Sequence, residues 1–368
     1  MRFMLVSILA LLITHMATAD ITPETVTKNK MKPPADTWIF VRDGFGPFYI
    51  FDAASGEMQG LLSTTFYTPA LEVNAERREI YAAEQHYTRT HRGTRTDVVT
   101  IYDSETLSPK AEIEIPKKVA ALGYRQYIAL MDDRKHLAVF NLTPAQSVSV
   151  VDIDTRAFVG EISTPGCALI MQTAGSGFLQ MCGDGRMQLI RLDKNGGEAQ
   201  RVRSKQVFDI EEDPFFDKPV PTPEGWLVVS YQGQVFEVTV EGDQIDVSKP
   251  WSLLSAEERE ANWRPGASGF FGYHAGLDLL LVLMNSKGGY SHDSPGTELW
   301  IYDRSQARKV AAVKLEASGS HIYVTQNAEP LVAVSGADGQ VHIYDVATTK
   351  RVRSIAQIGA SPGYIQGF

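Results

Sequence analysis

The stretch Val98-Val-Thr-Ile-Tyr-Asp-Ser-Glu-Thr-Leu107 decides the fold, because the chain repeats its pattern along most of its length. Its β-branched and aromatic residues alternate between two faces, with Val99 and Ile101 on one of them, as in a half-buried strand. Asp103 and Ser104 come next, and such side chains can hydrogen-bond the backbone of a tight turn. The stretch therefore predicts one arm of a β-hairpin.

The pattern of a strand followed by aspartate recurs in four further close copies and two weaker ones. The close copies end at Asp52, Asp152, Asp303 and Asp345, and the weaker ones span residues 187–193 and 235–242. Successive copies lie 51 (52 to 103), 49 (103 to 152), 41 (152 to 193) and 42 (303 to 345) residues apart. A period of roughly 40–50 residues with several short strands per unit is typical of a β-propeller.

Each copy has an apolar strand before it and a further strand after its turn. Seven units of this kind predict an all-β fold, a seven-bladed β-propeller with four-stranded antiparallel blades over residues 37–368. The alternative is a β-sandwich or two stacked β domains. Even spacing over more than 300 residues argues against that alternative, because a sandwich rarely extends so far as one domain.

The N-terminus resembles an export signal. Residues 1–19 have a basic start, a short apolar middle and an Ala17-Thr18-Ala19 cleavage site, which predicts a signal peptide and an exported protein. The other interpretation of residues 1–19 is a membrane anchor. Elsewhere in the sequence, no second apolar run is long enough to span a membrane. Residues 20–36 are polar and contain prolines, so they predict an arm outside the propeller, either a disordered tail or a segment that grips a partner.

The charge of the chain argues against nucleic acid as a partner. The formal net charge is −9, and removing residues 1–19 takes away Arg2 and makes it −10. An acidic exported protein lacks the basic surface that nucleic-acid binding requires. The charge agrees with a basic protein partner or simply with a solvated surface.

The two cysteines, Cys167 and Cys182, lie in neighbouring predicted strands of one blade. We expect them to form a disulfide, because exported proteins oxidise such pairs. Closing a loop of about 15 residues stabilises a fold by roughly 3 kcal/mol in the chain-entropy model. The sequence has no CxxC motif and no histidine cluster near these residues, so we expect no metal site there.

Two loops are candidate contact surfaces. Residues 42–47 form a glycine-rich turn around Phe45, which either folds back on its blade or is presented to a partner. Residues 84–97 carry Arg89, Arg92 and Arg95 with two histidines. This basic loop is either a solvated hairpin or a docking site for a partner rich in carboxylates.

A long insertion in the sixth unit predicts the only helix. Ser255-Ala-Glu-Glu258 has the order of a capping box, and Pro265 cannot continue a helix, so the helix is short. The loop after it contains His292 next to Asp293, which suggests acid–base chemistry only if the two side chains face each other. No other catalytic motif is present, so we expect no catalytic residue, cofactor or metal ligand in this chain.

Several segments give the chain a family resemblance. Residues 254–266, Leu-Ser-Ala-Glu-Glu-Arg-Glu-Ala-Asn-Trp-Arg-Pro-Gly, then Tyr273-His274, residues 290–292 and residues 295–303 resemble the heavy subunit of quinoprotein amine dehydrogenases, the methylamine and aromatic amine dehydrogenases. Residues 95–107, 140–145 and 148–152 and the spacing of the two cysteines are similar too. The resemblance covers essentially the whole mature chain.

The resemblance implies a function for the chain. It implies a seven-bladed propeller within a periplasmic heterotetramer of two heavy and two light subunits. The light subunit would carry tryptophan tryptophylquinone and the catalytic aspartate, so this chain would bind no cofactor itself. The complex would oxidise a primary amine to an aldehyde and ammonia and pass the electrons to a blue-copper protein.

The resemblance also implies a role for one phenylalanine. A heavy-chain phenylalanine near the first blade lines the substrate entrance in this family, and Phe45 is the nearest match, with Phe48 as the other choice of register. The family usually has lysine after the loop histidine, where this chain has Asp293, so the loop's role and the subfamily stay open.

Two other functions remain. The first is a non-catalytic exported propeller that acts as a binding or scaffold protein, and the second is an independent propeller hydrolase, for which catalytic residues are missing. The sequence leaves open which amine is used and which electron acceptor is served.

Overall fold

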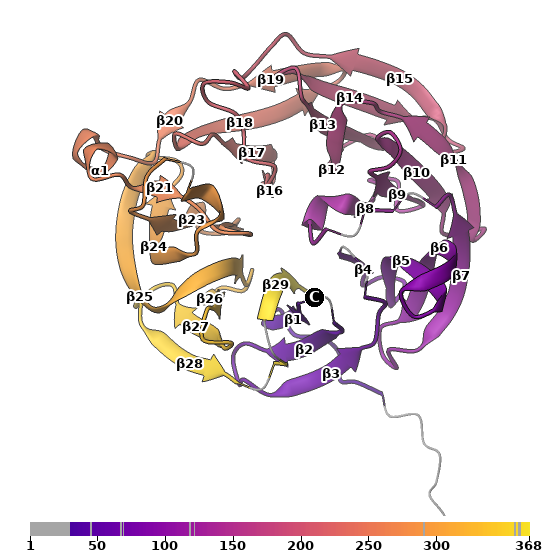
Figure 1. Cartoon of the computed structure of the whole chain (residues 1–368), viewed down its shortest axis with the longest axis horizontal. Helices are drawn as coiled ribbons and strands as arrows, with labels where there is room; N and C mark the ends of the chain where they lie inside the picture. Colours follow the sequence, from indigo (N-terminus) through magenta and orange to yellow (C-terminus); the bar gives the residue numbers. More distant parts are fainter. Residues whose placement is uncertain are drawn as a thin grey trace, which may run out of the picture.

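The computed structural model describes residues 30–44, 46–66, 68, 70–117, 119–120, 122–289, 291–356, 358–359 and 362–368. In this part of the chain the strands form antiparallel sheets around a central axis, as Figure 1 shows. The predicted signal peptide lies outside the described residues, as do residues 20–29 of the predicted arm. The described residues contain no helix long and apolar enough to cross a membrane.

Five sheets follow a four-strand path, as the repeat predicts. The first, in the order β29-β1-β2-β3, comprises β29 (Pro362–Gly367), β1 (Trp38–Asp43), β2 (Phe48–Asp52) and β3 (Met58–Leu62). The second comprises β4 (Leu71–Asn74), β5 (Glu79–Arg89), β6 (Arg92–Asp103) and β7 (Pro109–Ile115). The third comprises β8 (Ile128–Leu130), β9 (His136–Asn141), β10 (Ser147–Asp152) and β11 (Ala157–Ser163), and the short 3-10 helix η1 (Arg125–Tyr127) precedes it.

The next two sheets follow the same plan. The fourth comprises β12 (Cys167–Thr173), β13 (Gly177–Cys182), β14 (Met187–Leu192) and β15 (Glu198–Arg203). The fifth comprises β16 (Val220–Pro221), β17 (Gly225–Val229), β18 (Gln234–Glu241) and β19 (Gln244–Val247), with β20 (Trp251–Ser252) also paired to β18. Side chains buried between neighbouring sheets form the hydrophobic core.

The prediction of seven four-stranded blades was wrong. The described residues contain five sheets of the predicted plan, and the rest of the propeller is one eight-stranded sheet. That sheet comprises β21 (Arg264–Pro265), β22 (Phe271–His274), β23 (Leu279–Asn285), β24 (Gly296–Asp303), β25 (Arg308–Val324), β26 (Leu331–Gly336), β27 (Val341–Asp345) and β28 (Arg351–Ile355).

The long strand β25 is the reason for this difference. Its first half pairs with β24 and its second half pairs with β26, and the registers shift near Gly319. No proline or aspartate interrupts residues 308–324, so no turn separates the two halves. The copies that end at Asp303 and Asp345 therefore share one sheet.

The repeated aspartate acts as the sequence predicts. The Oδ1 atom of Asp103 accepts hydrogen bonds from the backbone N–H groups of Glu105 and Thr106, both at 2.9 Å. Asp152 binds the N–H groups of its own turn in the same way, at 2.8 and 2.9 Å. Each aspartate thus fixes the turn that follows its strand.

The predicted helix is present but has only five residues, α1 (Ala256–Glu260). Ser255 accepts a hydrogen bond from the N–H group of Glu258, and the Glu258 side chain accepts one from the N–H group of Ser255, which completes the capping box. The helix lies at the outer edge of the ring (Figure 1). A second 3-10 helix, η2 (Ser291–Asp293), contains His292.

The described end of the predicted arm lies against the protein's own second sheet. The backbone N–H group of Met31 donates to the carbonyl oxygen of Glu105 at 2.7 Å, and Lys30 forms an ion pair with the Glu105 carboxylate at 2.8 Å. Met31 and Leu107 are both partly buried and pack against the same hydrophobic core. Whether the arm also grips a partner stays a prediction.

Candidate functional site

The central axis of the propeller contains a cavity of about 540 Å³. The innermost strands β4, β16, β22 and β29 line it, together with η1 and the last residues of β25. Figure 1 shows β29, β4 and β16 arranged around this axis. A cavity of this volume suits a small organic molecule.

Arg125, the first residue of η1, faces this cavity. Its Nη2 atom donates to Glu72 Oε2 at 2.7 Å and its Nη1 atom donates to the carbonyl oxygen of Ile128 at 3.3 Å. Burial alone lowers the pKa of Arg125, but the Glu72 carboxylate outweighs this effect and raises it. Because the Arg125 side chain is still 42% exposed, its guanidinium faces the open space of the cavity.

Two buried polar atoms in the cavity wall have no hydrogen-bond partner among the described residues. They are the hydroxyl of Tyr364, a residue that is only 8% exposed, and Nδ1 of His321. Burial raises the pKa of the Tyr364 hydroxyl, so it keeps its proton at neutral pH. Burial, assisted by Lys218, lowers the pKa of His321 to about 4, so its ring is neutral.

Two glycines give the wall its shape. A Cβ atom on Gly269 would lie 2.3 Å from the His321 ring, and one on Gly367 would lie 2.0 Å from the Tyr323 hydroxyl. Any other residue at these two positions would clash with the rings. The absence of a Cβ atom therefore leaves the space in which His321 and Tyr323 line the cavity.

A smaller hollow of about 110 Å³ adjoins this cavity and contains the predicted histidine. The ring of His292 lies 4.9 Å from that of Tyr231, measured between centroids, and its Nε2 atom is 3.5 Å from Asp293 Oδ2. The two side chains therefore do approach each other. Asp293 is 87% exposed, however, so solvent screens this pair and the contact gives no sign of a buried acid–base site.

The predicted channel residue Phe45 lies outside the described residues. Phe48, the other choice of register, is fully buried, and its ring contacts those of Phe40 and Tyr364 at 6.3 Å. Phe48 therefore belongs to the hydrophobic core and does not line an entrance. Arg42, at the start of this loop, is also buried and donates to the carbonyl oxygen of Phe66 at 2.8 Å.

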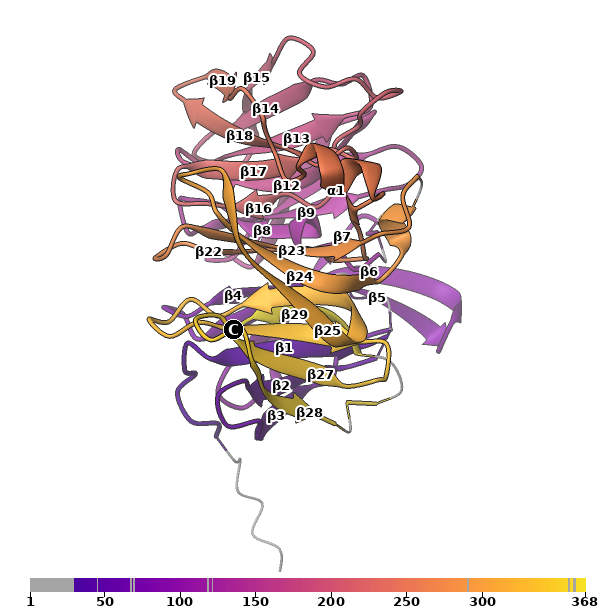
Figure 2. The same cartoon turned by 90° about the vertical axis from the view of Figure 1, so that its left-hand side faces the viewer.

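The basic loop is the extended hairpin of β5 and β6, which projects beyond one face of the ring in Figure 2. Arg89 and Arg92 are exposed and face each other across the hairpin. Arg95 is different, because its guanidinium binds both carboxylate oxygens of Asp97 at 2.5 Å. The structure therefore leaves only part of the predicted basic surface exposed, and a role in docking stays a prediction.

Cys167 and Cys182 form a disulfide with an S–S distance of 2.05 Å. They are opposite each other in the register of β12 and β13, within the fourth sheet. The predicted pairing is thus present, and it links two neighbouring strands of one blade.

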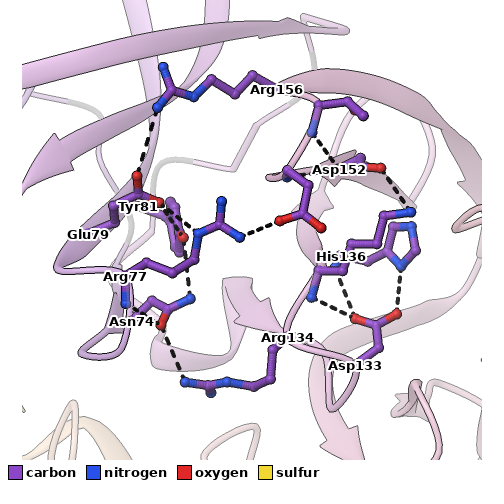
Figure 3. Close-up of polar contacts among 12 residues, drawn as sticks. Asn74, Arg77, Glu79, Tyr81, Asp133, Arg134, His136, Asp152 and Arg156 are labelled. Carbon is purple, nitrogen blue, oxygen red and sulfur yellow. Dashed lines mark hydrogen bonds and ion pairs between the residues drawn. The ribbon is translucent and has the colours of Figure 1, made fainter.

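A cluster of paired polar residues lies elsewhere, between the second and third sheets (Figure 3). Glu79, at the start of β5, accepts a hydrogen bond from the Tyr81 hydroxyl at 2.8 Å. Its carboxylate also lies 3.2 Å from Lys110, 3.4 Å from Arg77 and 3.9 Å from Arg156. Arg77 in turn pairs with Asp154 in the third sheet. We interpret this group, the Glu79 cluster, as a structural link between two blades.

Tryptophan pairs are relevant because the implied quinone is built from two tryptophans. The rings of Trp263 and Trp300 are 4.9 Å apart between centroids, but Trp300 is buried and donates to Glu298 at 2.6 Å, with Lys309 over its ring. Neither tryptophan lines the cavities described above. We therefore assign no substrate chemistry to this pair. The described residues also contain no cluster of three or more metal-binding side chains.

Sequence reasoning did not single out the residues that meet in the central cavity. Arg125, His321 and Tyr364 are far apart in the chain and belong to no recognisable motif. Only the closure of the ring brings them together, so no local signal could have found them.

Comparison with solved structures concerns the fold alone. A structure described as the β-propeller domain of Cps50 (Swd1) from Myceliophteria thermophila aligns with a TM-score of 0.59 and 13% identity, over 84% of this chain and 94% of that one. The structure of dihydro-heme d1 dehydrogenase NirN in complex with DHE aligns with a TM-score of 0.55 and 14% identity, over 91% of this chain and 76% of that one.

Comparison with protein sequences is more specific. The methylamine dehydrogenase heavy chain from Paracoccus versutus is 29% identical over 323 residues, which cover 86% of this chain and 75% of that protein. The heavy chain from Methylobacillus flagellatus is 25% identical, over 85% of this chain and 79% of that protein. The sequence model of the methylamine dehydrogenase heavy chain (MADH) family matches residues 43–367. The chain therefore belongs to the methylamine dehydrogenase heavy chain family.

Proposed function

We propose that this chain is the heavy subunit of a periplasmic amine dehydrogenase and works with a separate light subunit that carries tryptophan tryptophylquinone. The observation that carries the proposal is the family match over residues 43–367, which spans nearly the whole described chain. The relatives at 25–29% identity that are named methylamine dehydrogenase heavy chains support it. Which amine the complex oxidises is a separate question.

The proposed reaction converts a primary amine and water into an aldehyde and ammonia. It releases two electrons and two protons, and a blue-copper protein is the proposed acceptor of the electrons, one at a time. The quinone on the light subunit would supply the oxidising chemistry. This chain would provide a rigid propeller, and Phe45 would line the substrate entrance. We assign no catalytic residue to it.

Purification from the native source tests the proposal. The expected result is a small disulfide-rich chain that co-purifies with this one and has a visible absorption band that bleaches when a primary amine is added. A colourless single chain that does not respond to methylamine or to aromatic amines would overturn the proposal. That outcome would favour the non-catalytic scaffold instead.

The substrate entrance can be tested in the same complex with Phe45→Ala. Since the residue is proposed to limit the size of the entering amine, we expect the ratio of kcat/KM values for a bulky and a small amine to change by about tenfold. Phe48→Leu is the matched control, because Phe48 is a core residue, and it should affect stability more than selectivity. An unchanged ratio in Phe45→Ala would remove that residue from the channel.

A further inference from the structure

We propose that the central cavity binds a small organic carboxylate with a flat apolar body, held by Arg125 and Tyr364. This site lies within the heavy chain and is distinct from amine oxidation on a light subunit. The inference therefore does not depend on the proposed function, and it can fail or succeed separately. Three observations carry it: the charge of the cavity wall, its unpartnered hydrogen-bonding groups, and its aromatic surfaces.

The charged residues that line the cavity are both cations. They are Arg125 and Lys218, and the described part of the lining contains no aspartate or glutamate. Glu72 and Asp217 pair with these cations at 2.7 Å each but are not part of the lining. A molecule in the cavity therefore contacts the two cations and neither carboxylate, which favours a negatively charged group.

The wall also offers unused hydrogen-bond donors. A guanidinium has five N–H groups, and the described contacts of Arg125 occupy two of them. The hydroxyl of Tyr364, another lining residue, has no hydrogen-bond partner among the described residues. An unpaired buried hydroxyl costs free energy, which a ligand oxygen would recover. A carboxylate has two acceptor oxygens and suits two neighbouring donors.

The rest of the cavity favours a flat apolar body. Phe270 and Phe271, whose ring centroids are 4.0 Å apart, line the cavity together with Tyr124, Tyr273 and Phe368. Aromatic rings stack on planar ligands through offset or edge contacts. A volume of about 540 Å³ holds a benzoate-sized molecule with some water.

A protonated amine is a poor candidate for this site. An ammonium group has only donors and no acceptor, so it offers no partner to the guanidinium of Arg125. It would also be repelled by Arg125 and Lys218. The amine that the complex is proposed to oxidise is therefore not the expected occupant.

Isothermal titration calorimetry of the full chain with benzoate tests the inference. We expect one benzoate per chain, with an affinity at least tenfold higher than that for benzyl alcohol or benzylammonium, because only benzoate carries the charge that Arg125 recognises. No binding of benzoate, or equal binding of the three compounds, would overturn the inference. Since the light subunit is not needed, failure of this experiment leaves the proposed amine dehydrogenase untouched.

Substitutions locate the site. Tyr364→Phe removes one hydroxyl and should weaken benzoate binding about tenfold. Tyr344→Phe is the matched control, because Tyr344 is also buried with an unpartnered hydroxyl but does not line the cavity, and it should leave the affinity unchanged. Equal effects of the two substitutions, or no effect of Tyr364→Phe, would contradict the site.

The charge is tested by the pair Arg125→Gln and Glu72→Gln, made together so that no buried charge loses its partner. We expect the double variant to lose benzoate binding by more than tenfold. The double variant Arg351→Gln and Glu316→Gln removes an ion pair of 2.8 Å that does not line the cavity, and it should bind as the parent does. Full binding by the first double variant would refute a role for Arg125.

Discussion

The Glu79 cluster and the central cavity are built from the same residue types but differ in how completely their polar groups are paired. In the cluster, one carboxylate with 5% side-chain exposure contacts a tyrosine, a lysine and two arginines. In the cavity, Arg125 has one carboxylate partner and the hydroxyl of Tyr364 has none. The residues of the cluster line neither cavity described above, whereas Arg125 and Tyr364 line one of about 540 Å³.

This difference shows that residue composition alone does not separate a structural site from a binding site. A paired network stabilises the fold, because each buried group finds its partner inside the protein. A site with unpaired groups and open space lowers stability slightly and leaves those groups available to a ligand. The following predictions test this distinction, beginning with the largest effect.

Glu79→Ala should be the most damaging change. It removes the common partner of Tyr81, Lys110, Arg77 and Arg156 and leaves the buried Tyr81 hydroxyl with only a 3.4 Å hydrogen bond from the Asn74 amide. We expect a loss of about 3 kcal/mol in the free energy of unfolding, measured by urea denaturation. Benzoate binding should be unchanged at temperatures where the variant is folded. A loss below about 0.5 kcal/mol would mean that the cluster is not a structural link.

The next prediction concerns the pH dependence that His321 gives to stability. The folded protein holds the pKa of His321 at about 4, whereas the unfolded chain has a histidine pKa of about 6.5. Between these values the unfolded chain binds a proton that the folded protein does not, so stability falls as pH decreases from about 6.5 to 4. The contribution, discounted for solvent in the cavity, is roughly 2 kcal/mol.

His321→Gln isolates this contribution from the carboxylates that titrate in the same range. Urea denaturation of parent and variant at pH 4.5, 5.5 and 7 should show the variant losing less stability as the pH falls. Lys218 and Tyr364 face this histidine and are present in both proteins. A constant difference between the two proteins across this range would show that His321 is not held neutral.

Tyr81 in the Glu79 cluster and Tyr364 in the cavity allow a paired hydroxyl to be compared with an unpaired one. Tyr81→Phe removes a hydroxyl that donates to Glu79 and should cost about 1 kcal/mol. Tyr364→Phe removes an unpartnered hydroxyl and should change stability by less than about 0.5 kcal/mol. Thermal unfolding of both variants checks the order. If Tyr364→Phe were the more destabilising, its hydroxyl would have a partner within the fold.

The ion pair in the cavity should have the smallest effect on stability. Because the Arg125 side chain is 42% exposed, replacing Arg125 and Glu72 together by glutamine should change the free energy of unfolding by only about 0.5 kcal/mol. The same variant is expected to lose benzoate binding. A large loss of stability would place this pair with the Glu79 cluster and not with a binding site.

Local features of the fold could be predicted from the sequence. The repeated aspartates, such as Asp103, the capping box at Ser255 and the pairing of Cys167 with Cys182 all depend on residues close in the chain or in neighbouring strands. The division of the last part of the propeller could not be predicted, because β25 continues where the repeat implied a break. The cavity residues Arg125, His321 and Tyr364 were missed for a related reason. They are far apart in the chain and come together only when the ring of sheets closes.

The family was recognised from a resemblance, since composition and motifs gave no chemistry. The segment around Trp263 and the loop with His292 carried that resemblance, and the family match over residues 43–367 confirms it. The most specific residue assignment, Phe45, remains a prediction because it lies outside the described residues.

The position of β29 has a consequence for the time at which the protein can fold. Residues 362–367 form the innermost strand of a sheet whose other strands come from residues 38–62, and the Gln366 side chain also bonds the backbone of Leu71 in both directions. The edge of β1 that pairs with β29 therefore stays unpaired until residues 362–367 are available. Until then the chain is an open arc, which a chaperone or a translocation machine can hold before the last strand completes the circle.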